Sequence, residues 1–336
     1  MMDRREFSVT LGLAAAAGLV QPRALFGSGQ RATVFDWRTI NDSMHVAFGA
    51  GGNALALVDT GALVLVDTKN VGYGQALVDE AEKFNGALRA VINTHHHPDH
   101  IGGNPFFTSS VPVISQANGV PRATAFGEAT IADIMGDPIA RLKEMTDQAR
   151  DMDITPAAKE VSSGSVAAFV AMVEKLKPSD FAATVTIDSE GERTIGSTVI
   201  HMRYVDHGHT DNDLFVWLPQ ANVLHCGDLF FNGMHPRIDV SAGANTVSWQ
   251  RCIAAMLATA NDDTVVIPGH GEISDVKGLQ TFNDYFDILR DFVQKAIDSG
   301  NSRDEIMLMQ PPQFQDWPPA RLNQNLGIIY DEITVA

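Results

Sequence analysis

A cluster of histidines lies inside the chain, directly after the apolar stretch at residues 88–92. Residues 93–100 read NTHHHPDH, so four imidazoles and one carboxylate fall within six positions, from His95 to His100. Imidazole nitrogens and carboxylate oxygens are common zinc ligands in proteins. A solvated histidine-rich loop or a purification tag has a similar composition, but a tag is terminal and carries no aspartate at a fixed offset. The cluster therefore predicts part of a metal site at the end of a strand.

Three further positions place a histidine or an aspartate next to glycine, each directly after an apolar stretch. They are Gly208-His209, Gly227-Asp228 and Gly269-His270, which follow residues 199–204, 222–226 and 264–267. Glycine lets the backbone turn tightly at such a position, so the neighbouring side chain can point off the edge of a sheet. If these strand ends lie at one edge, their side chains meet those of the first cluster.

In this order, the four motifs resemble the metal motif of the metallo-β-lactamase-fold hydrolases, which is His-x-His-x-Asp-His, Gly-His, Asp and Gly-His. The resemblance covers roughly residues 34–289 without a helical insertion, and it implies two Zn²⁺ ions per chain, with iron or manganese as other possible metals. It implies one ion held by His95, His97 and His209, a second held by Asp99, His100 and His270, and Asp228 as the bridge between them. Asp99 is also the expected catalytic residue, because it would lie near the bridging water and could accept or relay a proton.

Hydrolysis is the reaction that such a pair of ions implies. Water held between two zinc ions loses its proton near neutral pH, so no serine or cysteine nucleophile is needed, and the sequence has no Gly-x-Ser-x-Gly motif. We expect a zinc-dependent hydrolase of a small ester, thioester, lactone or amide, including a β-lactam-like one. Aspartate at position 228 is usual in thioesterases, lactonases and nucleases of the fold, whereas residues 208–219 are closer to the β-lactamases. The bond that is cleaved therefore stays open.

Two other functions stay open as well. A mononuclear iron enzyme similar to the persulfide dioxygenases has related motifs on the same fold, and iron content with oxygen uptake would identify it. A non-catalytic, metal-dependent binding or assembly module would keep the ligands without turnover. Flavodiiron oxidoreductases carry glutamate where this chain has His97, so the motif argues against them.

The loop after Asp228 is expected to contact the substrate. Asn232 and His235 are candidate donors to an oxyanion, and Arg237 is a candidate for binding a substrate carboxylate through two parallel hydrogen bonds. An ion pair between Arg237 and Asp239 is the alternative interpretation of this arginine.

The composition indicates a large buried core and a small-molecule substrate. The chain has 336 residues, of which 45% are hydrophobic, and its two cysteines cannot form a disulfide framework. Its formal net charge is -17, and no block of Lys or Arg follows the first few residues. Nucleic acid is therefore not expected as a partner, because phosphate backbones are bound through basic surfaces. The sequence does not predict an oligomeric state.

Residues 1–30 resemble a twin-arginine signal segment. Arg4-Arg5 is followed by Phe7 and then by the apolar residues 10–20, a stretch too short to span a membrane as an ordinary helix. An amphipathic N-terminal helix of a cytosolic protein is the alternative. We expect export to the periplasm or beyond it, without stable membrane insertion unless the leader stays uncleaved.

The fold class predicted for residues 31–300 is α/β, as a four-layer αββα sandwich. Short β-rich stretches alternate with helical ones, and two sheets stacked core to core with helices outside satisfy this order. A helical insertion is expected at about residues 119–177, and a C-terminal extension at residues 301–336. Strands are predicted at residues 32–35, 44–48, 53–59, 62–67, 88–93, 111–115, 183–187, 193–195, 197–204, 214–218, 222–226 and 264–267, and helices at 74–84, 247–260, 276–297 and around 320–326.

Overall fold

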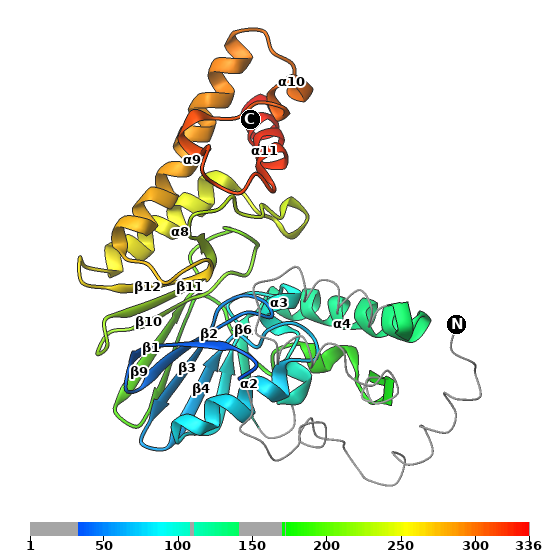
Figure 1. Ribbon diagram of the computed structural model, residues 1–336, viewed down its shortest axis with the longest axis vertical. Helices are drawn as coiled ribbons and strands as arrows, with labels where there is room; N and C mark the ends of the chain where they lie inside the picture. The colour runs from blue at the N-terminus through cyan, green and yellow to red at the C-terminus, as the bar shows by residue number, and fades with distance from the viewer. Residues whose placement is uncertain (1–32, 108–110, 141–169, 172, 336) are drawn as a thin grey trace.

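Two β-sheets pack face to face in the computed structural model, and helices cover their outer faces (Figure 1). The structure describes residues 33–107, 111–140, 170–171 and 173–335. Within them, the first sheet has the order β1 to β7: Asp36–Asn41, Met44–Phe48, Ala54–Asp59, Ala62–Val66, Ala87–Ile92, Val113–Gln116 and Val185–Ile187. The second has the order β12-β11-β10-β9-β8: Val265–His270, Val223–Phe231, Phe215–Leu218, Thr198–Arg203 and Glu190–Ile195.

Each sheet combines antiparallel and parallel pairs. Strands β1 to β4 form an antiparallel meander, whereas β4, β5, β6 and β7 run parallel. The turn between β3 and β4 contains Thr60 and Gly61, both with positive φ (49° and 77°), which is the hairpin geometry that matches strand twist. In the second sheet β11 and β12 are parallel. The ends of β4, β5 and β6 consequently lie at one edge, where the chain turns into functional loops.

The main core lies between the two sheets. Leu55 and Leu57 of β3 point into this core, whereas Ala54, Ala56 and Val58 of the same strand face the opposite side. This alternation follows from the two-residue period of a strand. Inward side chains of the second sheet, such as those of Ile200, Met202, Val216, Val223 and Ile267, complete the layer. The four-layer α/β sandwich predicted from the sequence is therefore confirmed.

Helices cover the outer face of each sheet. On the first sheet, α2 (Gly74–Ala81) buries apolar side chains against the strands and continues into η2 (Glu82–Phe84). On the second, α8 (Thr246–Thr259) and the amphipathic α9 (Val276–Asp298) are capped by Asn245 and Asp275, whose side chains accept hydrogen bonds from the first turns. The C-terminal helix α11 (Leu322–Val335) packs on α9, α10 (Arg303–Met307) packs on α11, and their apolar side chains join the same core.

Short helices and one long helix occupy the connections. They are α3 (Pro98–Ile101), η3 (Asn104–Phe106), α4 (Gly119–Gly136), η4 (Pro178–Phe181), η5 (Val240–Ala242) and η6 (Pro312–Phe314). Figure 1 shows α10 and α11 on the side of the sheets where α3 lies.

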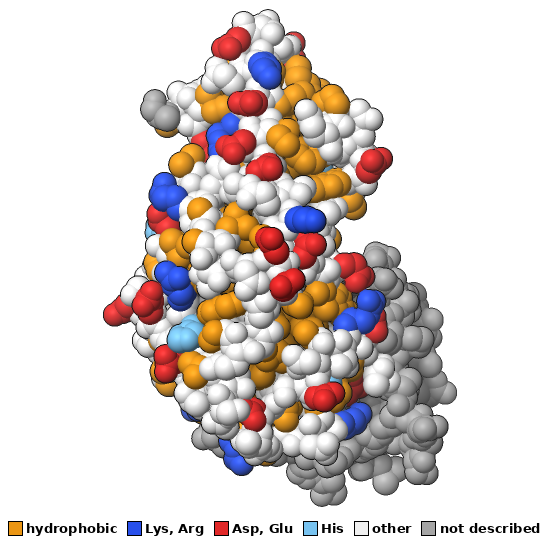
Figure 2. All heavy atoms as spheres, turned by 90° about the vertical axis from the view of Figure 1, so that its left-hand side faces the viewer, with side chains coloured by type: hydrophobic (Ala, Val, Ile, Leu, Met, Phe, Trp, Pro, Cys, Tyr) orange, Lys and Arg blue, Asp and Glu red, His pale blue; other side chains and the backbone are white. Residues whose placement is uncertain are grey.

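Figure 2 shows Lys and Arg side chains scattered among acidic ones over one face. Among the described residues, no helix is both long and apolar enough to cross a membrane.

Several predicted boundaries were wrong. The first strand begins at Asp36, so Val34 and Phe35 are buried outside it, and β8 begins at Glu190 rather than at residue 193. The last helix runs on from Leu322 to Val335, and α3 and α10 were not predicted. The helical insertion is described at α4 and near its end, whereas residues 141–169 and the predicted leader at 1–30 lie outside the described residues.

Candidate metal centre

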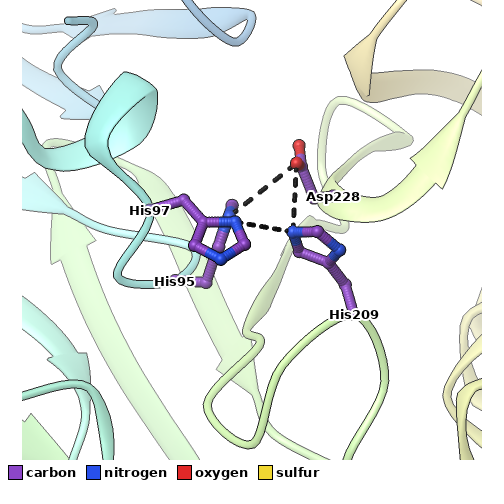
Figure 3. Close-up of side chains that lie close together, drawn as sticks. All are labelled: His95, His97, His209 and Asp228. Atoms are coloured by element: carbon purple, nitrogen blue, oxygen red, sulfur yellow. Dashed lines mark hydrogen bonds and ion pairs between the residues drawn. The ribbon is translucent and has the colours of Figure 1, made fainter. Parts of the chain in front are cut away.

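Two groups of side chains converge at the edge of the sheets where β5 ends. His95, His97, His209 and Asp228 form the first group, and Asp99, His100 and His270 form the second. Within each group, the potential ligand atoms all lie within 4.8 Å of one another. Figure 3 shows the rings of the first group pointing toward the Asp228 carboxylate. All seven residues expected from the sequence motifs are thus brought together.

Asp228 lies between the two groups. Its Oδ2 is 3.8 Å from His95 Nε2, 3.3 Å from His209 Nε2 and 3.4 Å from His270 Nε2. Its Oδ1 is 3.1 Å from His100 Nε2, but this contact lacks hydrogen-bond geometry. One carboxylate therefore faces histidines of both groups, as a ligand shared by two ions would.

The backbone around Asp228 differs from the prediction. We expected β11 to end at Cys226, but the strand continues through Asp228 to Phe231, and β12 includes Gly269 and His270. Gly227 interrupts the register with a positive φ of 52°, and a Cβ there would meet the Thr94 side chain. Only glycine adopts this conformation at no steric cost, and the resulting irregularity aims Asp228 at the histidines.

Hydrogen bonds behind the histidines determine which ring nitrogen carries the proton. Asp67 Oδ2 can only accept, so the Thr94 hydroxyl, 2.8 Å away, donates to it. That hydroxyl oxygen then accepts from His95 Nδ1 at 3.1 Å. The neutral His95 ring therefore presents the lone pair of Nε2 to Asp228 and the centre.

The same argument applies to three more histidines. His209 Nδ1 lies 2.7 Å from the carbonyl oxygen of Arg237, which can only accept. His97 Nε2 lies 2.8 Å from Asp239 Oδ2, and His100 Nδ1 lies 2.7 Å from Asp67 Oδ2. His209 Nε2 and His97 Nδ1 lie 2.8 Å apart, where a metal ion would take the place of a shared proton. In the neutral rings the opposite nitrogens, His209 Nε2, His97 Nδ1 and His100 Nε2, thus carry the lone pairs, and each faces the centre. This is the protonation pattern that a metal requires.

Electrostatics favour neutral rings at His95 and His209 and positive charge in the second group. Burial holds the pKa of His95 and His209 well below the usual value, and nearby histidines lower it further. Burial also opposes charge on His270, but Asp228 and Asp99 outweigh it and raise its pKa to about 9. Burial opposes ionisation of Asp99, yet His100 and His270 keep its pKa well below the usual range. The carboxylates therefore create a strong preference for a cation at the second group.

Buried atoms without partners test whether a metal fits here. His95 Nε2, His100 Nε2 and Asp228 Oδ1 have no hydrogen-bond partner within the described part of the chain, although each is fully buried. Buried polar atoms are normally paired, so these three atoms, which belong to both groups, are suited to bind a metal. Nitrogen and carboxylate donors in this number suit zinc, and the residues therefore fit the metal.

The profile of the metallo-beta-lactamase superfamily matches residues 48–270, a segment that contains all seven residues of the two groups. The chain belongs to this superfamily. A metallo-beta-lactamase type 2 from Bacillus sp. (strain 170) is 27% identical over 229 residues, which are 68% of this chain and 69% of that relative. A metallo-beta-lactamase type 2 from Bacillus cereus is 32% identical over 84 residues, which are 25% of this chain and 32% of its own length.

Solved structures with the same fold include a metallo-beta-lactamase and an alkylsulfatase. The DIM-1 metallo-beta-lactamase superposes with a TM-score of 0.52 at 18% identity, covering 75% of this chain and 96% of its own. The inverting sec-alkylsulfatase Pisa1 from Pseudomonas sp. gives 0.61 at 18% identity, covering 89% of this chain and 50% of its own. At these identities the likeness concerns the fold alone. Membership in the superfamily makes the chain a metal-dependent hydrolase.

The three predicted substrate contacts lie in different surroundings. His235 is buried against Tyr285, Phe314 and Trp317, with Nδ1 3.0 Å from the Tyr285 hydroxyl, so its ring packs in an aromatic cluster rather than with the metal-site histidines. This corrects its expected role as an oxyanion donor.

Asn232 and Arg237 border the centre through their backbone. The backbone N–H of Asn232 donates a hydrogen bond to the carbonyl oxygen of the ligand residue His270. Its side chain donates to the Glu272 carbonyl oxygen at 2.9 Å. Arg237 is half-exposed and pairs with Asp239 at 3.2 Å, which was the alternative interpretation of this arginine. His96 turns away from both groups and accepts a hydrogen bond from Asn212.

Sequence reasoning missed the residues that hold the ligands in place. Asp67 and Asp239 fix three histidine rings directly or through Thr94, yet neither belongs to a motif. Arg122 of α4 forms two hydrogen bonds with Asp211, two residues after His209, so the insertion borders the site. The only available signal was for Asp67, an acidic residue directly after an apolar strand at the same edge.

Proposed function

We propose that this chain is a dinuclear zinc hydrolase of a small ester, thioester, lactone or amide, with β-lactam-like amides included. His95, His97 and His209 would hold one ion, Asp99, His100 and His270 the other, and Asp228 both. Zinc at such a centre supplies Lewis acidity, which activates water at neutral pH and polarises the carbonyl group that is attacked.

The position of the Asp228 carboxylate carries the proposal. Its Oδ2 faces His209 at 3.3 Å and its Oδ1 faces His100 at 3.1 Å, so its oxygens reach both groups. A single-ion enzyme needs neither this bridge nor a second set of ligands. The arrangement therefore supports two ions over the mononuclear iron chemistry of a persulfide dioxygenase.

Three residues of the chain would act around the reacting bond. Asp99 is 28% exposed at its side chain and stays ionised, so it can accept a proton from the attacking water and pass it to the leaving group. Arg237 would bind an anionic group of the substrate if it exchanges its pairing with Asp239 for the ligand. Asn232 keeps one side-chain N–H for an oxyanion while the other holds the Glu272 carbonyl.

Metal content and hydrolysis measured on the same preparation test the proposal. We expect close to two zinc ions per chain, and turnover of at least one member of a panel of lactams, lactones, thioesters and aryl esters. A chelator should abolish turnover, and zinc should restore it. Asp99→Asn should lose turnover and bind the second zinc ion more weakly while staying folded, whereas Asp59→Asn, at the opposite edge of the sheet, should keep its turnover and both ions. One iron ion per chain with oxygen uptake on persulfides would overturn the proposal.

We also propose that the chain is exported through a twin-arginine leader. The pair Arg4-Arg5 with Phe7 and the short apolar stretch that follows support this. The test is cell fractionation of the full chain beside a variant with Lys at positions 4 and 5. Retention of that variant in the cytoplasm is the expected result, and equal distribution of both proteins would contradict export by this route.

A further inference from the structure

Arg321 lies beside the metal centre although it is far from the metal motifs in sequence. Its guanidinium carbon is 6.0 Å from the centre of the Phe231 ring. Phe231 stacks on the ligand His270, with ring centres 5.2 Å apart and planes 13° apart, and it also contacts His209. One aromatic ring therefore connects this arginine with ligands of both groups.

The C-terminal segment holds Arg321 at this position through buried contacts. Asn325, one helical turn later, is 1% exposed and donates to the Pro236 carbonyl oxygen at 2.9 Å, which ties the start of α11 to the loop after Asp228. It also donates to the Tyr285 hydroxyl at 3.0 Å, and Tyr285 stacks on Trp317. The position of Arg321 is thus fixed from both sides along the chain.

The backbone at Arg321 adopts a disfavoured conformation. Its φ is +73°, in the left-handed region where an arginine is strained and a glycine is not. Such strain persists only where surrounding contacts impose it, and it concentrates at functional positions. The sequence has arginine at a turn where glycine would be more stable, which indicates that the side chain is needed.

The guanidinium is available for a ligand. Arg321 is exposed, and it makes no ion pair with a carboxylate in the part of the chain that the structure describes. By contrast, Arg303 of the same segment pairs with Asp331 at 2.8 Å, and Arg237 pairs with Asp239. In a chain with a net charge of -17, an unpaired arginine at the rim of a catalytic centre is a specific feature.

We propose that Arg321 binds a carboxylate or sulfate group of the substrate, away from the bond that is cleaved, so that this hydrolase selects anionic substrates. The planar fork of a guanidinium matches two oxygens of such a group, and Phe231 supports its flat face. This rests on the proposed hydrolase function and adds a substrate class to it. The C-terminal segment thereby supplies a specificity-determining residue to a centre built by the rest of the chain.

A pair of esters that differ in charge tests this inference. Mono(4-nitrophenyl) adipate and 4-nitrophenyl hexanoate share a leaving group and a chain length, but only the first carries a distal carboxylate. We expect wild-type protein to prefer the anionic ester, and Arg321→Gln to lower the ratio of the two kcat/KM values about tenfold, mainly through KM. Arg321→Lys keeps the charge without the fork and should retain part of the preference.

Arg303→Gln is the matched control, because it removes a partly exposed arginine from the same C-terminal segment. Its ratio of kcat/KM values should equal that of the wild type. An unchanged ratio in Arg321→Gln, or equal use of both esters by the wild type, would overturn the inference. Adipic mono(4-nitroanilide) at rising concentration should also inhibit the wild type more strongly than hexanoic 4-nitroanilide does.

If zinc-loaded wild type hydrolyses neither ester, the proposed esterase activity fails, and binding of the two anilides still decides the role of Arg321. Equilibrium dialysis of the anilides needs no turnover. Tighter binding of the anionic anilide to wild type, lost in Arg321→Gln but kept in Arg303→Gln, supports the inference. Equal binding of both anilides to wild type contradicts it.

Discussion

Replacing Asp67 by asparagine removes a carboxylate that controls a proton of the metal centre. Asp67 is fully buried and accepts three hydrogen bonds. Its Oδ1 accepts from the Thr94 backbone at 2.8 Å, and its Oδ2 accepts from the Thr94 hydroxyl at 2.8 Å and from His100 Nδ1 at 2.7 Å. An amide offers one acceptor oxygen and one NH₂ group, so it cannot accept all three.

The cost of this change falls mainly on the second group of ligands. If the amide oxygen keeps the Thr94 backbone, the NH₂ group faces His100 Nδ1, and two donors oppose each other at a cost of about 1–3 kcal/mol. The ring can avoid this by moving its proton to Nε2, but that removes the lone pair that faces Asp228. Either outcome should weaken zinc binding at the second group roughly 10- to 100-fold, or about 1.4–2.8 kcal/mol.

Stepwise zinc competition with a chromogenic chelator measures this loss. The weaker of the two zinc steps should move by the stated factor, and the other should move less, because His97 and His209 keep Asp239 and the Arg237 carbonyl. Asp59→Asn is the control: this carboxylate also accepts several hydrogen bonds, from Ser197 and Thr198, but at the opposite edge of the sheet. Wild-type affinity at both steps in folded Asp67→Asn would refute the proton assignment.

Three further predictions concern groups around the centre. Burial lowers the pKa of Lys69 from 10.5 to about 7, so the unfolded chain binds this proton more readily than the folded chain does. The free energy of unfolding, relative to that of Lys69→Met, should therefore rise by roughly 1.4 kcal/mol per pH unit between about pH 7.5 and 9.5 in denaturant titrations. A difference that does not change with pH would contradict this. Asp239→Asn should weaken zinc binding at the first group about tenfold, because His97 loses its partner; unchanged chelator competition would be the contrary result. Gly52→Ala would place a Cβ inside the His100 ring and should lower both zinc content and melting temperature, whereas Gly136→Ala, which meets nothing within 4 Å, should not.

The fold and the ligand positions could be predicted because both depend on local pattern. Apolar stretches with a two-residue period identify strands, and glycine beside His or Asp after such a stretch marks a turn at a sheet edge. The predicted stretches at residues 44–48 and 62–67 agree with β2 and β4 to within one residue. The parallel pairing of β4, β5 and β6 then brings the end of each strand to one edge without further information.

The predictions failed where tertiary contacts override local pattern. Gly227 and Asp228, directly after Cys226, favour a turn rather than a strand, yet β11 continues to Phe231 because it pairs with β12. Lys69 would ordinarily be placed on the surface. Here it is fully buried and donates to the carbonyl oxygens of Ala47 and Gly52, which hold the loop that packs against His100.

A ligand motif specifies which side chains face a metal, but not which of their nitrogens is free to bind it. In this chain that choice depends on acceptors elsewhere: Asp239 is 142 positions from His97, and the Arg237 carbonyl is 28 positions from His209. Because an imidazole with its proton on the wrong nitrogen binds no metal, these acceptors are as necessary as the ligands themselves. Asp239 and Arg237 both belong to the segment after β11, and Asn325 ties that segment to the C-terminal helix that positions Arg321. The C-terminal residues and the protonation of the first group of ligands therefore depend on the same loop, so removing α11 should disturb zinc binding as well as substrate selection.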